Sequence, residues 1–483
     1  MATDVAELQS KKPHIVVLSS PGMGHVIPLF EFAKRLVLLH GCHVTFLNIT
    51  TEASVAQIQL LHSPNLPLGL SVVDFPPVDL SGMVTDHTLA LTRLSVNVQQ
   101  SLLSLKSMLL QLHRPQAVVI DLFCTQAFEI CKELSIPTFM FFTASTHLLA
   151  FSLLLPQLDR DVTGEFVDLA APIQVPGCSP VRTQDLLDQV RDRKSDDYKW
   201  YLYHLSRVPM ADGVFLNTWE DLEQLPVRAI REHSFYKKML TAPVCSIGPV
   251  IKETEPVTGR GTECLAWLEE QPANSVVFVA LGSGGTLSAE QLTELAWGLE
   301  LSRQRFIWVV RTPNDANACA AFFDVGGEMN DPKSYLPERF IERTGGRGLV
   351  VPSWAPQVAV LQHRSTAAFL SHCGWNSVLE SLAHGVPIIA WPLYSEQRMN
   401  ATTLAEEVGV AVKVAGEKAE RRVVGREEIE RAVRLMVEGR EGMEMRQRAM
   451  KLQESAMKAL GYSGSSHESL ARVAEQWKAT LKN

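Results

Sequence analysis

Two residues in the first third of the chain have the types and positions needed for acid–base chemistry. His25 follows the apolar run His14–Ser19 and a glycine-containing turn, and it stands at the start of a helical pattern. Asp121 ends a second apolar run, Ala117–Asp121. In open α/β sheets, ligands bind at the carboxyl ends of the strands. We therefore predict a His–Asp pair, in which the carboxylate fixes the imidazole tautomer and stabilises the protonated ring.

Both residues also have structural explanations that the sequence leaves open. A histidine at the start of a helix is more often an exposed cap than a base. Asp121 could cap the helix that follows it. Spacing alone does not show that the two side chains touch, so the pair is a hypothesis that requires a structure.

A second candidate site lies where the buried run Ala367–Ser371 leads into His372 and Gly374. Asn376 and Ser377 are N-cap residue types, and apolar residues follow them at helical spacing, which predicts that a helix begins there. A helix N-terminus presents unpaired N–H groups and a partial positive charge. This arrangement suits a phosphate group.

Ser283 marks a third position, in the turn after the apolar run Ser275–Leu281. Its small neighbours permit close approach of a ligand to the backbone. A tight turn without chemical function explains the same residues equally well.

The elements that would position these residues form two similar series. Apolar runs that read as buried strands alternate with helical stretches, which predicts two doubly wound parallel sheets of the Rossmann-like type. The predicted strands are His14–Ser19, Val44–Ile49, Leu70–Phe75, Ala117–Asp121, Pro137–Phe142 and Gly213–Thr218 in the first series, and Ser275–Leu281, Arg305–Val310, Gly348–Ser353, Ala367–Ser371, Pro387–Pro392 and Val410–Val414 in the second.

Length and composition agree with two domains. The chain has 483 residues, with 46% hydrophobic and 20% charged residues, which is ordinary for a globular enzyme. The segment 248–263 is rich in proline and glycine and is the predicted linker between domains 1–247 and 264–460, followed by a C-terminal helix in 461–483. Residues 314–332 read as a loop.

Charge, cysteine usage and hydropathy limit the possible partners. The net charge of −8 argues against nucleic acid. The eight cysteines form no metal-binding pattern, so we expect reduced thiols and no metal. No apolar run reaches the length of a membrane span, and the N-terminus lacks the apolar region of a signal peptide. We expect a cytoplasmic monomer without an integral membrane segment.

Other enzyme classes fit the motifs less well. The turn before His25 lacks the third glycine of a dinucleotide fingerprint, and the second strand lacks the acid that would hold the ribose of NAD. No Gly-x-Ser-x-Gly motif of a serine hydrolase is present. Asp159-Arg-Asp161 matches a loose metal-binding pattern, but it follows an apolar helical stretch ending in Pro156, so we interpret it as a solvated helix end.

The stretch Trp354–Gln397, without insertion, closely resembles the plant secondary-product glycosyltransferase box of the family 1 UDP-glycosyltransferases. The N-terminal half is also similar to this family. The resemblance implies the GT-B fold, in which two Rossmann-like domains face each other across a cleft, and a C-terminal helix that crosses back onto the N-terminal domain. It implies that His25 is the catalytic base and Asp121 its partner.

The resemblance also implies roles for the residues that would bind the donor, UDP-glucose, which is a co-substrate rather than a cofactor. Trp354 and its neighbour Ala355 would lie at the uracil, with the indole stacked on it, and Gln357 would hold the uridine. The pyrophosphate would meet His372, Asn376 and Ser377, close to Gly374, and Ser283 would contact the phosphate or the sugar. Glu380 would accept the ribose hydroxyls. The sugar would be held by Trp375, Glu396, Gln397 and Thr143. Glu396 stands where the family more often has Asp, and Gln397 matches its glucose-preferring members.

By overall resemblance, the chain is similar to the plant group that glucosylates small phenols, hydroquinones and monolignols. Flavonoid C-glycosyltransferases are close to that group. A phenolate is nucleophilic at oxygen and at the ortho carbon, so the same base serves a β-O-glucoside or a β-C-glucoside, and the motifs do not separate them. Residues 86–96 and Leu148-Leu149 are candidates for the acceptor pocket. A protein of another class, an inactive UDP-sugar-binding protein, would be expected to have lost His25 or Asp121.

Overall fold

The chain forms two compact units in this computed structural model. The first unit comprises Met1–Ile251 with Lys458–Asn483, and the second comprises Lys252–Met457. The structure describes residues 12–85, 87–112, 115–253, 261–315, 331–414 and 423–482. Part of the predicted linker, 254–260, and most of the predicted loop, 316–330, lie outside the described residues.

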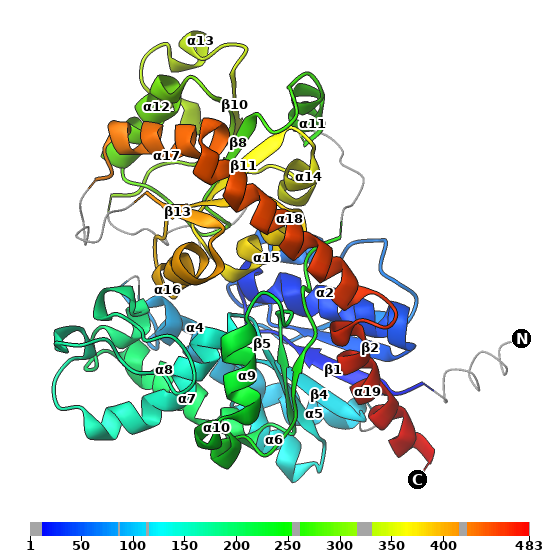
Figure 1. The fold of residues 1–483 in the computed structure, drawn as a ribbon. Coiled ribbons are helices and arrows are strands. Elements are labelled where there is room, and N and C mark those ends of the chain that lie inside the picture. Colours follow the sequence, from blue (N-terminus) through cyan, green and yellow to red (C-terminus); the bar gives the residue numbers. More distant parts are fainter. Residues whose placement is uncertain are drawn as a thin grey trace, which may run out of the picture. The chain divides into compact units, whose positions relative to one another are not determined.

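The first unit is built on a seven-stranded parallel sheet with the order β3-β2-β1-β4-β5-β6-β7 (Figure 1). β1 pairs with β2 on one side and with β4 on the other, so the strand order reverses between β1 and β4. Residues that follow these two strands therefore share one edge of the sheet, although they are far apart in the sequence. The strands are β1 His14–Leu18, β2 His43–Asn48, β3 Leu70–Asp74, β4 Ala117–Asp121, β5 Thr138–Phe142, β6 Gly213–Leu216 and β7 Val244–Ser246.

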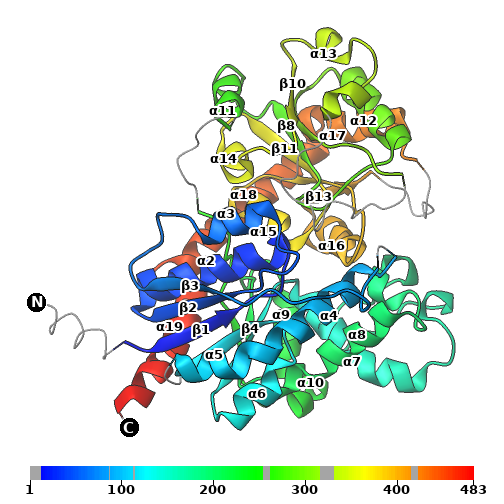
Figure 2. The same cartoon turned by 180° about the vertical axis from the view of Figure 1, so that it is seen from behind.

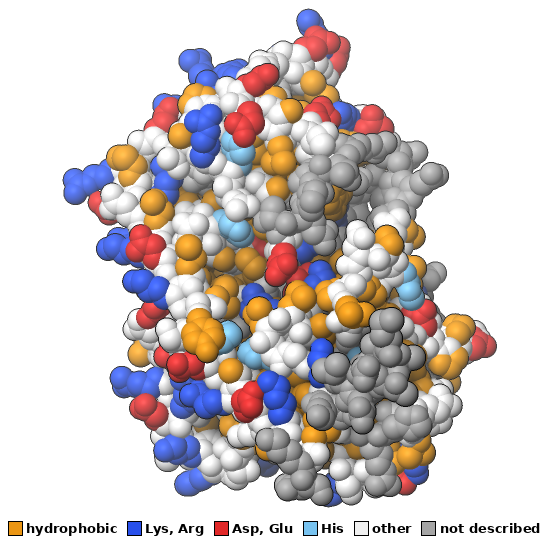
Figure 3. All heavy atoms as spheres, turned by 90° about the vertical axis from the view of Figure 1, so that its right-hand side faces the viewer, with side chains coloured by type: hydrophobic (Ala, Val, Ile, Leu, Met, Phe, Trp, Pro, Cys, Tyr) orange, Lys and Arg blue, Asp and Glu red, His pale blue; other side chains and the backbone are white. Residues whose placement is uncertain are grey.

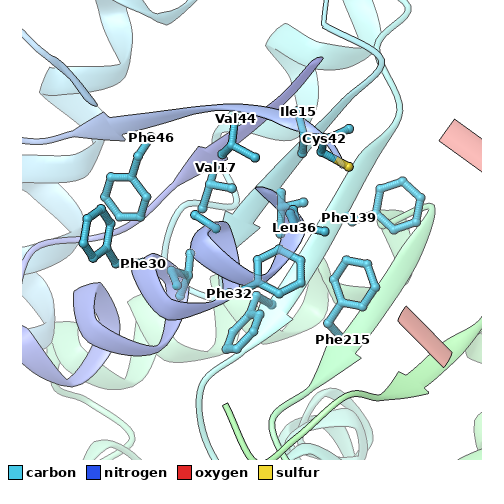
Figure 4. Packing of buried hydrophobic residues seen from close by; sticks show 14 of the residues in the cluster. Ile15, Val17, Phe30, Phe32, Leu36, Cys42, Val44, Phe46, Phe139 and Phe215 are labelled. Atoms are coloured by element: carbon cyan, nitrogen blue, oxygen red, sulfur yellow. The ribbon is translucent and has the colours of Figure 1, made fainter. Parts of the chain in front are cut away.

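Helices cover both faces of this sheet. The helix α2 begins after Gly22, whose φ of 106° favours glycine, and ends at Gly41 in the left-handed region. Figure 4 shows its buried side chains against the sheet, with Phe30 packed edge-on to Phe46 of β2. The helices of this unit are α2 Met23–His40, α3 Val55–Leu61, α4 Ala90–Ser101, α5 Leu105–Gln111, α6 Ala127–Glu133, α7 Thr146–Asp161, α8 Asp196–Ser206, α9 Gln224–Glu232, α10 Ser234–Met239 and α19 Ser465–Ala479.

The C-terminal helix α19 packs on the first unit. Its Trp477 is 3% exposed and meets Phe139 of β5 edge-on, with ring centroids 5.2 Å apart. Leu470 and Val473 of α19 belong to the same apolar core as β1 and α2. α19 also contacts α2 and the edge strand β7, and Figure 2 shows it in red at the C-terminal end of the chain. The chain thus returns to its first unit after completing the second.

The second unit has a six-stranded parallel sheet with the order β10-β9-β8-β11-β12-β13. Side chains of β8 alternate between the two faces: Val277 and Val279 pack with α12 and α17, whereas Val276 and Phe278 pack with α11 and α14. The strands are β8 Val276–Ala280, β9 Arg305–Val310, β10 Gly348–Pro352, β11 Thr366–Ser371, β12 Ile388–Ala390 and β13 Ala411–Lys413. The helices are α11 Gly261–Glu269, α12 Ala289–Ser302, α13 Phe340–Arg343, α14 Gln357–Gln362, α15 Trp375–Ala383, α16 Gln397–Thr402 and α17 Arg426–Glu438, with α18 Arg440–Leu460 running across the unit boundary.

All the predicted strands are present with ends within two residues, but some element boundaries were wrong. The short strand β7 was not predicted, and α11 begins inside the predicted linker. The helix α7 continues past Pro156 to Asp161, and Asp159 in its last turn binds Arg193 and Tyr198. The segment Asp159–Asp161 is the end of a helix, as predicted: Arg160 and Asp161 are exposed, and Asp159 is partly exposed although it is paired.

The surface carries both signs of charge. On the face drawn in Figure 3, acidic and basic side chains are interspersed. Within the part of the chain that the structure describes, no helix combines the length and the apolar character needed to cross a membrane.

Candidate active site

His25 and Asp121 are in contact in the first unit. Nδ1 of His25 lies 2.8 Å from Oδ2 of Asp121. The aspartate is fully buried, whereas 16% of the histidine side chain is exposed. Since the carboxylate engages Nδ1, the neutral ring carries its hydrogen there and its lone pair at Nε2. The predicted pair therefore has the geometry of a general base with an orienting carboxylate.

The surroundings of Asp121 keep it ionised. Burial alone would raise the pKa of this carboxyl, but the facing His25, its hydrogen bond and two further donors lower the pKa below its usual value. The donors are the Ser20 hydroxyl, at 2.7 Å, and the Phe123 amide, at 2.9 Å, both to Oδ1. Ser20 and Phe123 were not among the residues selected from the sequence. Only their positions could have indicated a role: Ser20 follows β1, and Phe123 lies two residues after Asp121.

Thr143 also belongs to this group. It follows β5, the neighbour of β4, and its Oγ1 lies 3.2 Å from Nδ1 of His25. The ring of Phe123 also lies close to His25, with a centroid distance of 5.2 Å. The predicted sugar contact of Thr143 stays a prediction, and the structure adds a contact with the base that was not foreseen.

His372 occupies the corresponding edge of the second unit, directly after β11. It is buried, and its Nδ1 has no hydrogen-bond partner among the described residues. Burial, with a smaller effect of Arg311, lowers the pKa of His372 to about 4, so the ring is neutral at neutral pH. A Cβ on Gly282 or Gly374 would come within 2.4 and 2.5 Å of Nε2, respectively. Both positions therefore require glycine if the ring is to stay where it is.

The helix α15 begins at Trp375, with Gly374 as its N-cap. The start predicted from the sequence, at Asn376 or Ser377, was wrong by one to two residues. Gly374 offers no side-chain oxygen to the first turn, so the helix lacks the cap that Ser or Asn would provide. Asn376 and Ser377 consequently lie in the first turn, where helix N–H groups and the dipole favour an anion.

Two residues assigned to the nucleoside by resemblance, Gln357 and Glu380, are in contact, together with Ser377, which was assigned to the pyrophosphate. Nε2 of Gln357, at the start of α14, donates to Oγ of Ser377 at 3.0 Å and to Oε2 of Glu380 at 2.6 Å. Trp354 is 58% exposed, an unusual fraction for so large an apolar ring. Its neighbour Ala355 is buried. An open indole beside a fixed amide and carboxylate provides a stacking face and hydrogen-bonding groups for a base and a ribose.

The end of the box forms a turn that is held from within. Oε1 of Gln397 accepts hydrogen bonds from the amides of Leu393, at 2.9 Å, and Tyr394, at 3.1 Å. The carbonyl of this side chain is thus committed to the turn, and its amide nitrogen is the group left to donate to a ligand. Glu396 is the N-cap residue of α16, and its contact with the sugar stays a prediction.

Asn400, which was not selected from the sequence, connects this turn to the segment that follows β11. Its Nδ2 donates to the carbonyl of Cys373 at 3.0 Å and lies 3.4 Å from Oε1 of Glu396. The residue is buried one helical turn after Glu396. The same side chain therefore fixes the segment that carries His372 and the turn that carries Gln397.

Ser283 lies at the same edge of the sheet, after β8, which is the neighbour of β11. The preceding Gly282 has a φ of 74°, which favours glycine. The carbonyl of Ser283 accepts a hydrogen bond from Nη1 of Arg311. The turn is thus held by a cation that follows β9.

No group of three or more His, Cys, Asp or Glu side chains that could hold a metal occurs among the described residues. In the segment Asp159–Asp161, the first carboxylate binds Arg193 and Tyr198, as described above.

Comparison with known proteins identifies the family. A family model described as UDP-glucoronosyl and UDP-glucosyl transferase matches residues 236–455. Anthocyanidin 3-O-glucosyltransferase 5 of Manihot esculenta is 44% identical over 98% of this chain and 97% of its own length. The chain belongs to this UDP-glycosyltransferase family. Hydroquinone glucosyltransferase of Rauvolfia serpentina is also 44% identical, over 98% of this chain and 99% of its own.

The solved structures agree with the fold of this UDP-glycosyltransferase. The structure of TcCGT1 in complex with UDP is 44% identical, covers 97% of this chain and 99% of its own, and has a TM-score of 0.90. The fold is therefore GT-B, with two Rossmann-like domains, as the sequence predicted. The enzyme uses a UDP-sugar as its co-substrate.

Proposed function

We propose that this UDP-glycosyltransferase transfers glucose from UDP-glucose to a small phenolic plant metabolite, with inversion to a β-O-glucoside. The observation that carries the proposal is the 2.8 Å contact between His25 and the buried Asp121. Such a pair serves a reaction that removes a proton from a weak acid, and a phenol is such an acid. Two relatives named for anthocyanidin and hydroquinone glucosylation support the phenolic acceptor.

In the proposed reaction, Nε2 of His25 accepts the phenolic proton while Asp121 holds Nδ1–H. The phenolate oxygen attacks the anomeric carbon of α-linked UDP-glucose, and the bond to the β-phosphate oxygen of UDP breaks. Attack from the opposite face converts α to β. Trp354, Ala355, Gln357 and Glu380 hold the nucleoside, and Trp375, Glu396, Gln397 and Thr143 hold the sugar in this scheme.

The departing UDP gains negative charge, which the edge of the second unit is suited to receive. The amides of the first turn of α15, with Asn376 and Ser377, and the turn at Ser283 offer hydrogen bonds and a favourable dipole. His372 acts here as a neutral hydrogen-bond donor, since its pKa of about 4 leaves it uncharged at neutral pH. We also propose that acceptor binding belongs to 1–247, donor binding to 264–460, and that the enzyme is a cytoplasmic monomer.

A β-C-glucoside is the second candidate product. The ortho carbon of a phenolate can attack the same anomeric carbon, and His25 would serve both reactions. TcCGT1 and the hydroquinone glucosyltransferase are each 44% identical to this chain, so overall similarity does not choose between the bond types.

The test is to incubate the purified protein with UDP-glucose and a panel containing hydroquinone, an anthocyanidin and a dihydrochalcone, and to measure UDP release and product. Acid hydrolysis that returns the aglycone identifies an O-glucoside, whereas resistance to acid identifies a C-glucoside. UDP-glucose binding without glucosylated product from any phenol would contradict the proposal and favour a UDP-sugar-binding protein.

A further inference from the structure

Arg311 follows β9 and lies at the edge of the sheet where the donor residues of the second unit gather. β9 pairs with β8 on one side and with β10 on the other. The guanidinium reaches both neighbouring turns: Nη1 donates to the carbonyl of Ser283, and Nη2 lies 3.5 Å from the carbonyl of Ser353. Arg311 thus joins the turn after β8 to the turn that precedes Trp354.

The charge of Arg311 is not balanced by a carboxylate among the described residues. Its two recorded partners are backbone carbonyls. Burial lowers the pKa of Arg311, but a guanidinium stays protonated at neutral pH. Arg311 is only partly buried, and a cation that has lost part of its hydration without gaining a counter-charge is favoured by an anion that compensates it. This imbalance indicates an anionic ligand.

Two further polar atoms at this edge lack partners among the described residues. They are Nδ1 of His372, on the side chain that is 7% exposed, and Oγ1 of Thr312, the residue after Arg311. The guanidinium is close enough to His372 to affect its titration. Arg311 follows β9 and His372 follows β11. The strand β8, which precedes the Ser283 turn, lies between these two strands. The edge therefore combines a fixed cation with two unsatisfied hydrogen-bonding groups.

We propose that Arg311 is the charge that selects the diphosphate of the donor: it favours UDP over uncharged uridine and holds the Ser283 turn in position. This inference rests on the proposed donor site. It adds a cation to that site, where the residues implied by resemblance include only neutral groups and carboxylates. Because a diphosphate is anionic and uridine is not, removing the cation must weaken UDP binding selectively.

The experiment is calorimetric titration of the full-length protein with UDP and, separately, with uridine. We expect Arg311→Gln, which keeps N–H donors but loses the charge, to weaken UDP binding roughly ten- to a hundredfold and uridine binding less than threefold. Arg311→Lys, which keeps the charge, should retain most of the preference for UDP. Arg434→Gln, a matched change on the exposed face of α17, should leave both affinities unchanged.

The two ligands separate the outcomes. Equal weakening of UDP and uridine in Arg311→Gln would show that the residue only supports the turns, and would overturn the inference. If Arg311→Gln does not fold, the Arg311→Lys variant provides the test. If that variant binds uridine but has completely lost the preference for UDP, the inference about the Arg311 charge is overturned. Failure of the wild-type protein to bind UDP would instead contradict the proposed function itself.

Discussion

The two units place a histidine at equivalent edges of two similar sheets, but in opposite electrostatic surroundings. His25, in the first unit, meets the buried carboxylate of Asp121 at 2.8 Å. His372, in the second, has no carboxylate partner among the described residues and is affected by the guanidinium of Arg311. One ring faces a negative charge and the other a positive charge.

This difference shows how a neighbouring charge assigns a task to an imidazole. A carboxylate stabilises the protonated ring, so a histidine beside it can take up a proton during a reaction. A buried histidine beside a cation resists protonation and can act only as a neutral hydrogen-bonding group. The first arrangement suits the acceptor, which must lose a proton, and the second suits a diphosphate, which needs donors.

The largest expected effect comes from removing the ring that faces the carboxylate. His25→Ala should lower kcat by ~10²–10⁴-fold, because general-base catalysis is lost. UDP-glucose binding should stay nearly unchanged, since the residues proposed to hold the UDP part of the donor belong to the second unit. Steady-state kinetics and calorimetry measure the two quantities. Lost UDP binding with retained turnover would reverse the assignment of tasks to the two histidines.

The second prediction uses the folded-state pKa of His372, which is about 4 against an ordinary value of 6.5. Below pH 6.5 the unfolded chain binds a proton that the folded protein does not, so the free energy of unfolding falls as the pH decreases from 6.5 towards 4. In His372→Gln, the decrease in the free energy of unfolding over this pH range should therefore be smaller than in the wild type by roughly 1–3 kcal/mol.

Urea unfolding at pH 7 and pH 5 measures the effect, with His87→Gln as the control, because His87 is exposed. Asp121 also loses stabilisation in acid, so the comparison must be between variants rather than between pH values alone. An acid sensitivity that is identical in His372→Gln and the wild type would show that His372 is not held neutral by its surroundings.

The third prediction concerns the turn that ends the box. Glu396 and Gln397 can pair with adjacent equatorial hydroxyls of glucose, and a sugar with an inverted hydroxyl leaves buried polar groups unpaired. We expect UDP-glucose over UDP-galactose by roughly ten- to a hundredfold in kcat/KM. Competition between the two donors with one phenolic acceptor measures this ratio.

Variants of Glu396 and Gln397 test whether this turn causes the preference for UDP-glucose. Glu396→Ala should lower turnover with both donors, since Glu396 supplies the accepting oxygens. Gln397→His should narrow the donor preference and also loosen the turn, because the Gln397 carbonyl binds two amides of its own segment. Equal use of both sugars by the wild type would show that this turn does not select the donor.

The smallest expected effect is none at all. Turnover should be the same with and without EDTA, because hydrogen bonds, the α15 dipole and the Arg311 charge are assigned to the leaving diphosphate. Loss of activity in EDTA, restored by Mg²⁺ or Mn²⁺, would mean that a metal ion supplies that charge instead.

The sequence by itself determined the local elements and the residues at their ends. Periodic apolar runs specify buried strands, and the strand before His372 and the strand ending at Asp121 were predicted correctly because their signals lie within a few neighbouring residues. The uninterrupted box from Trp354 to Gln397 determined the family and hence the GT-B fold, which the comparisons confirmed.

Only the tertiary structure decided which of those residues meet. The contact between His25 and Asp121 depends on β1 pairing with β4 rather than with another strand, and no local pattern encodes that order. The hydrogen bonds of Ser20 with Asp121, of Thr143 with His25 and of Arg311 with the Ser283 turn likewise depend on strand order. A side chain's charge and hydrogen-bonding capacity are properties of its type, but its partner is set by strand order, because adjacent strands bring together residues that the sequence keeps apart.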